Sequence, residues 1–329
     1  MRQLTVDEAS EGQRLDNYLV KQLKGAPKSL VYRVIRSGEV RVNKGRAAAD
    51  SRLALGDVVR VPPLRLAAGA AVDRAPGSSA STAPAREFPI VHEDEQLLVI
   101  DKPAGIAVHG GSGVSWGVIE QLRRARPQAR FLELVHRLDK ETSGLLLVAK
   151  KRSALVALQD LFRAGAASRA MTKTYAALVV GSWPARLKVI DQALLKTLDA
   201  QGERHVRIVP ADHDGARRAI TLVRVARALP GYSLLDVTLK TGRTHQIRVH
   251  LAGAGHVIVG DERYGDFERN RALARGQAVP GLRFDRMFLH ARRLVLPHPA
   301  SGEVLTLEAP LPRECEALLQ ALAATAPPP

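Results

Sequence analysis

Apolar side chains near the N-terminus recur every three or four positions, which is the spacing of one face of a helix. The residues on two such predicted faces are Leu15, Tyr18, Leu19 and Leu23, followed by Leu30, Val31, Val34 and Ile35. We expect Ser29 to cap the second helix and Gly38 to end it. Two short strands and the turn between them are expected at 40–42, 57–61 and 43–45. The pattern therefore predicts a compact unit at 14–62.

This regular pattern stops between Leu66 and Arg86. Alanine, glycine, serine and proline dominate the stretch, and its few apolar residues have no period that would let them pack. We therefore expect residues 66–86 to form a flexible linker between two domains.

A larger domain is predicted at 88–325, where strand-like and helix-like stretches mix. Helices are expected at 116–125, with Ser115 as the cap, at 153–162 and at 312–323. Strands are expected at 96–100, 172–180, 233–240, 294–296 and 304–307. Because helices and strands do not alternate regularly, we predict an α+β fold with a mixed, mainly antiparallel sheet flanked by helices.

The most unusual local pattern lies at 134–150. An apolar stretch runs into the charged segment His136-Arg137-Leu138-Asp139-Lys140-Glu141, then Thr142-Ser143-Gly144 turns the chain and a second apolar strand follows. Polar groups between two buried strands are costly to position, because they need partners or water. One interpretation is that Asp139 only caps the turn through its own backbone. The other is that the loop carries a functional site.

The composition limits the possible functions of the 329-residue chain. Its single cysteine, Cys315, excludes a disulfide framework, and no Cys/His cluster has the spacing of a zinc site. His245 and His250 are five apart, a spacing that suits a shared metal neither on a strand nor on a helix. We find no signal peptide, membrane-length apolar run or phosphate-binding glycine loop. We therefore expect a cytoplasmic protein with no membrane contact and no nucleotide cofactor.

The formal net charge of +16 favours a polyanionic partner, most simply a nucleic acid. A membrane surface would require a basic amphipathic helix, which the sequence does not offer. Within 14–62, eleven Lys/Arg stand against four Asp/Glu. The candidates for RNA contact cluster around the second helix and its exit: Lys28, Arg33, Arg36, Arg41, Lys44 and Arg46. A solvated helix face with no partner is the alternative.

Residues 14–62 resemble the S4 RNA-binding domain. The resemblance rests on Arg14-Leu15-Asp16, on the helix from Lys28 to Gly38 and on the following segment to Asn43. S4 domains bind structured RNA mainly through its shape and its phosphates, which agrees with a basic surface that is poor in aromatic residues.

From Phe88 onward the chain resembles the RluA-type family of RNA pseudouridine synthases. Five motifs occur in the family's order: Asp101-Lys102-Pro103-Ala104-Gly105, His136–Gly144, Lys173-Thr174-Tyr175, Gly242–His250 and Phe288-Leu289-His290-Ala291. With the S4-like unit, the stretches 22–29 and 109–113 look closest to the branch that modifies several uridines of large-subunit (23S) ribosomal RNA. Lys140 and Arg217 stand where Arg and Lys are common in the family, and both keep the charge.

The resemblance implies that the protein converts uridine to pseudouridine in RNA. The uracil leaves the ribose at N1 and rejoins it at C5, so no atom enters or leaves, and neither a redox cofactor nor a metal is needed. The resemblance assigns the reacting carboxylate to Asp139, as nucleophile or as stabiliser of a sugar cation. Arg248 would pair with it, because an ionised Asp buried beside a base needs a cation nearby. Tyr175 would stack on the uracil.

Further residues are expected to serve the same pocket. The resemblance places Arg137 in the helical stack that the flipped uridine leaves. We expect His136 to orient the loop. Lys102, His245 and His290 are expected to shape or line the pocket.

Two other functions compete with this interpretation. A non-catalytic RNA-binding factor of ribosome assembly would also explain the charge and the S4-like unit. A glycosidase-like hydrolase usually needs two carboxylates at a set separation, and the motifs supply only one. We expect large-subunit ribosomal RNA, or its assembly intermediate, as the partner of a monomeric enzyme.

Overall fold

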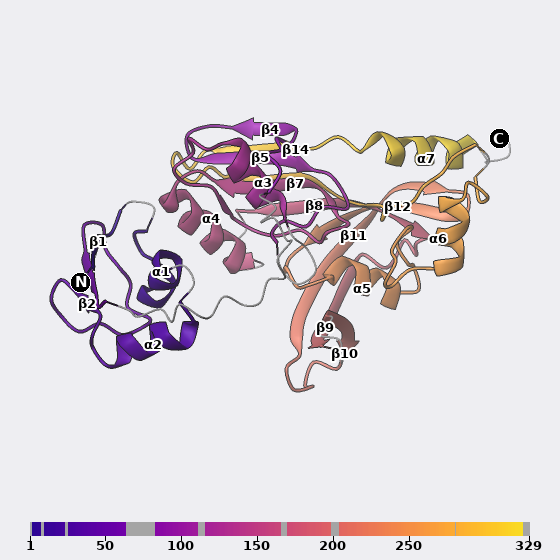
Figure 1. Ribbon diagram of the computed structural model, residues 1–329. Coiled ribbons are helices and arrows are strands. Elements are labelled where there is room, and N and C mark those ends of the chain that lie inside the picture. The colour runs from indigo at the N-terminus through magenta and orange to yellow at the C-terminus, as the bar shows by residue number, and fades with distance from the viewer. Residues whose placement is uncertain are drawn as a thin grey trace, which may run out of the picture. The chain divides into compact units, whose positions relative to one another are not determined.

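The computed structural model describes residues 2–7, 10–23, 26–63, 83–110, 116–165, 170–198, 204–279 and 281–324. Contacts divide the chain into two compact units, Met1–Thr82 and Ala83–Pro329 (Figure 1). Most of the expected linker lies outside the described residues. The narrower limits 14–62, 66–86 and 88–325 stay predictions.

The N-terminal unit is a three-stranded antiparallel sheet that shares one apolar core with two helices. Its elements are β1 (Arg2–Thr5), α1 (Leu15–Gln22), α2 (Lys28–Arg36), β2 (Arg41–Val42) and β3 (Val58–Val61), and the strand order is β1-β3-β2. The apolar faces expected of both helices pack in this core against Val59 and Val61 of β3. The turn between β2 and β3 has Asn43 and Lys44 in the left-handed region.

Two details of this unit differ from the expectations. Ser29 does not cap α2, because the helix begins at Lys28 and Pro27 precedes it as the N-cap residue. The ring of Pro27 fixes φ near the helical value, here −58°, so the helix starts before Ser29 is reached. Strand β1 was missed, because a four-residue edge strand is too short for its alternation to be recognised.

The C-terminal unit is built on one large sheet of eleven strands. Its strands are β4 (Ile90–Glu93), β5 (Leu97–Lys102), β6 (Glu133–Leu134), β7 (Ser143–Ala149), β8 (Thr172–Val180), β9 (Val189–Leu198), β10 (Arg204–Val209), β11 (Arg217–Leu229), β12 (Tyr232–Leu239), β13 (Leu289–Pro297) and β14 (Val304–Glu308). Its helices are α3 (Val118–Ala125), α4 (Arg152–Ala164), α5 (Gln246–Gly253), α6 (Phe267–Ala274) and α7 (Arg313–Ala324).

The strand order of this sheet is β10-β9-β11-β12-β8-β13-β7-β5-β4, with β14 paired to β13 and β6 paired to β7. Every pairing between the described strands is antiparallel except that of β7 with β13. The structure therefore confirms the predicted α+β fold with a mixed, mainly antiparallel sheet. None of the described helices is long and apolar enough to span a membrane. The cap expected for α3, Ser115, lies outside the described residues.

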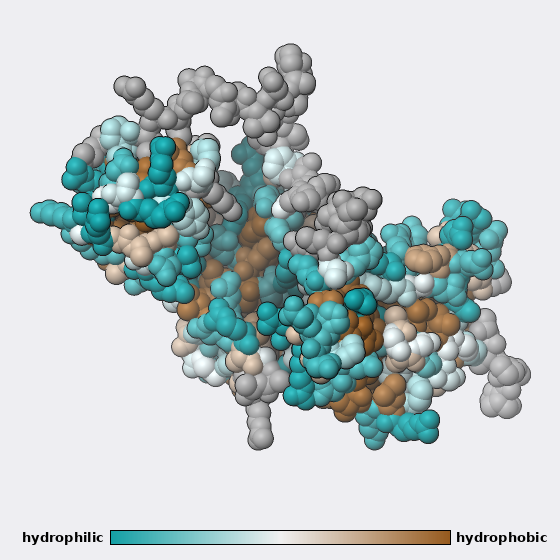
Figure 2. Space-filling view, turned by 90° about the horizontal axis from the view of Figure 1, so that it is seen from below, coloured by the Kyte–Doolittle hydropathy of each residue, from teal (hydrophilic) through white to brown (hydrophobic). Residues whose placement is uncertain are grey.

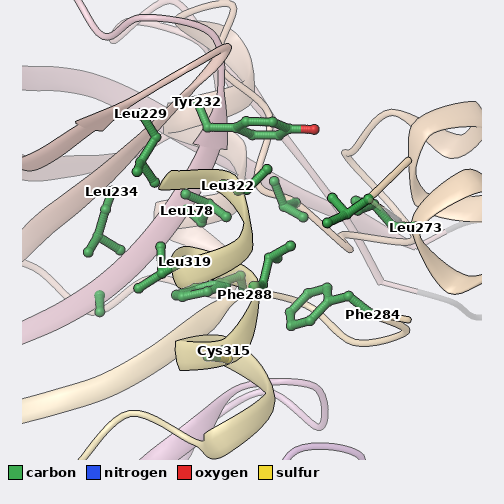
Figure 3. Close-up of a cluster of buried hydrophobic side chains, with 14 residues drawn as sticks. Leu178, Leu229, Tyr232, Leu234, Leu273, Phe284, Phe288, Cys315, Leu319 and Leu322 are labelled. Atoms are coloured by element: carbon green, nitrogen blue, oxygen red, sulfur yellow. The ribbon is translucent and has the colours of Figure 1, made fainter. Parts of the chain in front are cut away.

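Strand β8 lies near the middle of the sheet and separates two apolar cores. One core lies under α7 and includes Leu178 and Cys315 (Figure 3). The other contains Ala177 and Val179 and includes apolar residues of α5. Because side chains alternate along a strand, Tyr175 lies on the side of α5, together with Ala177 and Val179, as the sequence predicted.

The parallel contact between β7 and β13 depends on Gly144. Ser143 pairs with His290 and Gly144 with Ala291. Gly144 has φ +106°, and a Cβ at this position would lie 2.4 Å from the carbonyl oxygen of Ala291. Only glycine allows both this backbone conformation and this approach. The close approach therefore fixes where the loop that carries Asp139 enters the sheet.

We expect Gly144→Ala to destabilise the C-terminal unit by about 3 kcal/mol or more, because backbone strain and a steric clash add together. Gly302→Ala is the matched control: φ is +76° there, but a Cβ would meet nothing within 4 Å. It should cost only about 1–2 kcal/mol. Urea unfolding followed by tryptophan fluorescence measures both, since Trp116 and Trp183 belong to the C-terminal unit. Equal losses in the two variants would contradict this account.

Candidate active site

The charged loop between β6 and β7 presents Asp139 to residues of α5. The amide of Thr142 donates to the carbonyl of Asp139 at 3.1 Å, which closes the turn through the backbone. The Asp139 side chain is 27% exposed, and its Oδ2 lies 3.4 Å from Nη1 of Arg248 and 3.8 Å from Nε2 of His245. Among the described residues its carboxylate contacts these side chains and caps no backbone amide. A turn cap alone therefore does not account for where the Asp139 side chain lies.

Helix α5 carries Arg248 inward because its first turn is anchored on the neighbouring strands. The buried side chain of Gln246 accepts from the amide of Arg243 at 3.0 Å and donates to the carbonyl of Ile220 at 3.0 Å. His245 precedes the helix in the left-handed region, with φ 52°. This conformation turns its imidazole toward the same loop as Arg248.

Arg248 is held mainly by a second carboxylate. Its Nε and Nη2 donate to Asp261 at 2.8 Å each, and both side chains are nearly inaccessible. Burial works against both charges. The hydrogen bonds between them outweigh it, so the pKa of Asp261 lies below and that of Arg248 above its ordinary value. Arg248 is therefore a fixed cation beside Asp139.

Tyr264 contacts both His245 and Arg248. Its hydroxyl lies 2.9 Å from Nδ1 of His245, and the guanidinium of Arg248 stands 5.1 Å from the centre of its ring. Burial lowers the pKa of His245, although the charge of Asp139 acts in the opposite direction. His245 is therefore a neutral imidazole at neutral pH.

Tyr175 of β8 completes a cavity of about 70 Å³. The residues that line this cavity are Arg137, Leu138, Asp139, Thr142, Tyr175, Leu239, His245, Gln246, Ile247, Arg248 and Leu289. Burial, and then the charge of Asp139, raise the pKa of Tyr175 above its ordinary value. Its hydroxyl stays protonated at neutral pH. Arg137 lies at the same cavity with an exposed side chain.

Lys102 does not line the cavity but supports the loop from beneath. The side chain is fully buried, and Nζ donates to the carbonyls of Pro103, Ile106 and Lys140 at 2.8, 2.9 and 3.1 Å. Burial lowers the pKa of Lys102 to about 7. Three carbonyl acceptors match the three N–H bonds of the protonated amine, so the geometry favours the charged form. Lys102 thereby ties Lys140, the neighbour of Asp139, to the end of β5.

The two remaining histidines also act from outside the cavity. The ring of His136 stacks on Phe162 at 4.7 Å, and its Nε2 accepts from the amide of Leu147 at 3.2 Å. His290 is fully buried, with Nδ1 2.8 Å from Oγ of Ser143. On β13 Leu289 faces the cavity, so the alternation of the strand directs His290 away from it. His290 therefore shapes the loop from behind and does not line the pocket.

The basic residues expected to contact RNA lie on the N-terminal unit. Arg33 and Arg36 are exposed one turn apart on α2, and Lys44 and Arg46 are exposed in and after the β2–β3 turn. Arg41 is half-buried, and the side chain of Lys28 lies outside the described residues. Hydrophilic residues cover most of the visible face of this unit (Figure 2).

A larger groove, of about 460 Å³, lies on β8 and β11–β14 away from Asp139. Its carboxylates are already paired: Asp236 contacts Arg224 and Arg292, and Glu308 contacts Arg293 at 3.0 Å. The smaller cavity is therefore the better candidate for an active site, because it alone of these two joins an ionisable group to a fixed cation and an aromatic ring.

Known proteins match both units. Residues 96–253 match the family model described as RNA pseudouridylate synthase, and residues 13–59 match that of the S4 domain. The curated Ribosomal large subunit pseudouridine synthase C of Escherichia coli (strain K12) is 48% identical over 97% of this chain and 95% of its own length. The protein of the same name from Haemophilus influenzae is 46% identical over 98% and 95%.

The chain belongs to the family of RNA pseudouridylate synthases. This confirms the resemblance seen in the sequence, the enzyme class and the S4 domain. Among solved structures, Human RNA Pseudouridylate Synthase Domain Containing 4 is similar with a TM-score of 0.57 and 29% identity, covering 71% of this chain and 92% of that chain. Human RNA Pseudouridylate Synthase Domain Containing 1 has a TM-score of 0.53 and 27% identity, with 74% and 97% covered.

The sequence did not single out Asp261 and Tyr264, which hold Arg248 and His245. The available signal was weak, because Gly260-Asp261 after an apolar pair is also what an ordinary turn looks like. The sequence did separate His245 from His250. His250 is buried away from the loop, with Nδ1 2.8 Å from the hydroxyl of Thr221.

The buried His290 predicts a dependence of stability on pH. Burial lowers its pKa to about 4 in the folded protein, from an ordinary value of 6.5. Between these values the unfolded chain takes up a proton and the folded chain does not. Stability should therefore fall as the pH drops from 6.5 toward 4, by about 1.5 kcal/mol between pH 6.5 and pH 5 from this residue.

Urea unfolding at several pH values measures this dependence. His290→Asn should be less stable at pH 7, because it loses buried contacts, but its stability should decline less steeply toward pH 5. An equally steep decline in both proteins would show that His290 is not the source.

Proposed function

We propose that this protein isomerises uridine to pseudouridine in large-subunit ribosomal RNA, at several uridines. The names of the curated relatives support this substrate, as do the S4 domain and the net charge of +16. The observation that carries the proposal is the cavity in which Asp139, Arg248 and Tyr175 meet from three distant segments. A non-catalytic assembly factor is not favoured, because it would have no use for this arrangement.

Asp139 is the proposed catalytic residue. Isomerisation breaks the bond from N1 of uracil to the ribose and forms a bond from C5, so it needs a group that holds the ribose or the base between these steps. A partly exposed carboxylate can attack either or can stabilise a sugar cation. The reaction conserves its atoms, so the proposal includes no cofactor.

Tyr175 and Arg248 are proposed to hold the reacting partners in place. The ring of Tyr175 offers a flat apolar surface on which uracil can stack. Its raised pKa means that it enters the reaction as a neutral phenol. Arg248 keeps a positive charge beside Asp139, so the carboxylate has a cation within reach while RNA closes the site.

A uridine inside a helix must first be flipped out, which costs roughly a few kcal/mol. Arg137 is the proposed substitute for the missing base. It lines the cavity, stands two positions before Asp139 in the sequence, and has an exposed side chain. Its guanidinium is planar and can stack on the neighbouring bases.

The S4 domain is proposed to supply most of the affinity. Its exposed arginines and lysine suit RNA phosphates, and a flexible linker would raise the effective concentration of RNA near the active site. The proposal also includes a monomer in the cytoplasm, where ribosomal RNA is assembled into particles.

Asp139→Asn tests the proposed reaction. We expect full-length variant protein to keep its fold and its RNA affinity but to form no pseudouridine in large-subunit ribosomal RNA from a strain that lacks the enzyme, since the amide is a poor nucleophile. Glu141→Gln, which removes a charge from the same loop, is the control and should retain activity. Pseudouridine mapping and filter binding measure both properties. Product formation by Asp139→Asn would overturn the assignment.

Combined substitution of Arg33, Arg36 and Lys44 by Gln tests the proposed RNA surface. We expect weaker binding of ribosomal RNA and a shallower salt dependence, with the slope of log K against log salt reduced by about 0.7–0.9 per lost phosphate contact. The kcat at saturating RNA should not change, because none of the three lies at the cavity. Unaltered binding and salt dependence would contradict the proposed surface.

A further inference from the structure

Lys173 of β8 is a basic residue that the reaction proposed above does not use. Its side chain is half-buried. Because side chains alternate along a strand, Lys173 lies on the same side of β8 as Tyr175, about 7 Å along the strand from it. Lys173 lines a second, small cavity of about 10 Å³ together with His136 and Phe162, and Tyr175 is the residue that this cavity shares with the proposed active site. The lysine is therefore a near neighbour of the ring on which uracil is proposed to stack.

The amine of Lys173 lies beside an exposed segment of the chain. Nζ stands 5.2 Å from the centre of the Phe162 ring on α4. It also lies 3.8 Å from the place that a Cβ on Gly242 would occupy. Residues 242–244 are exposed and lead directly into His245 at the active site. Nζ therefore lies at the rim of the site, between this segment and α4.

Among the described residues, no carboxylate pairs with Lys173. Burial lowers its pKa, and no acid raises it again. By contrast Arg248, Arg286 and Lys150, which are also shielded from water, each contact a carboxylate at 2.8 Å. A cation withdrawn from water without a counter-charge is costly, and an aromatic ring compensates for it only weakly. The position of Lys173 is therefore explained better by an anionic partner outside the chain.

We propose that Lys173 binds a phosphate of the RNA backbone next to the flipped uridine. This inference rests on the proposed function, because it assumes that the uracil stacks on Tyr175. A base on that ring would bring its own phosphates to the same rim, and a lysine is a compact point charge that suits a phosphate oxygen. The phosphate would supply the counter-charge that the described part of the fold does not, and it would raise the pKa of the amine again.

This contact would differ in purpose from those proposed for the S4 domain. The basic residues of that domain would hold the RNA as a whole, whereas Lys173 would hold only the nucleotide that reacts. A cation that pairs only with the substrate stabilises the docked nucleotide and is left without a partner in the free enzyme. Activity and stability should therefore respond in opposite directions when the charge is removed.

Lys173→Met tests this contact and keeps the length of the side chain. We expect kcat/KM to fall about 10- to 100-fold, because a hydrogen bond to a charged group is lost. The melting temperature should stay the same or rise, because a shielded cation is removed from the free protein. Lys173→Arg keeps the charge and should retain more activity than Lys173→Met. An unchanged kcat/KM together with a lower melting temperature in Lys173→Met would show a merely structural lysine and would overturn the proposal.

Two matched variants separate this contact from other effects. Lys151→Gln removes a charge from the residue before α4, where Lys151 pairs with Glu95 at 3.4 Å, and should keep kcat/KM within about 2-fold. Phe162→Leu removes the aromatic contact of Lys173 and the ring on which His136 stacks, but it keeps the lysine. Both variants should therefore still recognise the phosphate.

A methylphosphonate linkage, in which a methyl group replaces one charged oxygen, identifies the phosphate directly. It is placed on either side of a uridine that the unmodified protein is found to modify, in a synthetic fragment of large-subunit ribosomal RNA. At one of the two positions the unmodified protein, Lys151→Gln and Phe162→Leu should each lose about 10- to 100-fold in kcat/KM, whereas Lys173→Met should lose less than about 3-fold. Equal losses in Lys173→Met and in the unmodified protein at both positions would overturn the proposal.

The two possible failures are distinguishable. If pseudouridine mapping finds no uridine modified by the unmodified protein, the proposed function fails, and the inference about Lys173 fails with it. If the unmodified protein is active but neither phosphate is coupled to Lys173, only the inference about Lys173 fails.

Discussion

The site depends on one cation shared by two carboxylates. Burying the charge of Arg248 would be strongly destabilising without a partner, and Asp261 compensates for it with two short hydrogen bonds. Because Arg248 is already paired with Asp261, its contact with Asp139 is a single, longer one. The surrounding contacts serve this arrangement: Gln246 anchors the helix that carries Arg248, and Lys102 ties down the loop that carries Asp139. One guanidinium thus stabilises a buried carboxylate and a partly exposed one at the same time.

Much of the fold and of the site could be predicted because the signals are local. Periodicity located α1, α2, β8 and α7. The ordered motifs identified Asp139, Tyr175 and Arg248 as candidates from the sequence alone, and all three line the same cavity. What could not be predicted depends on partners far along the chain. Neither the hairpin β9–β10, strand β11 nor helix α6 was expected, because their apolar residues acquire a consistent face only once the neighbouring elements are in place.

The errors have the same origin at smaller scale. Ser29 looked like a helix cap because Ser usually is one, but the restricted backbone of Pro27 decided the start of α2. His290 is not one of these errors: it was expected to shape or line the pocket, and the alternation of β13 places it behind the loop, where it can only shape it. Asp261 follows a glycine like many turn residues, and only the fold shows that it also pairs with Arg248. In each case the residue type indicated what the side chain can do, and the fold decided which partners it meets.

The parallel junction of β7 with β13 also determines when the enzyme becomes competent during synthesis. Ser143 and His290 are 147 positions apart, so the loop with Asp139 reaches its final position only after β13 has left the ribosome. The sheet of the N-terminal unit consists of β1, β2 and β3 alone, so all of its strands lie within the first 82 residues. Contacts between distant segments form slowly, and domains generally fold as units from the N-terminus. A nascent chain would therefore acquire its RNA-binding domain well before it acquires an active site.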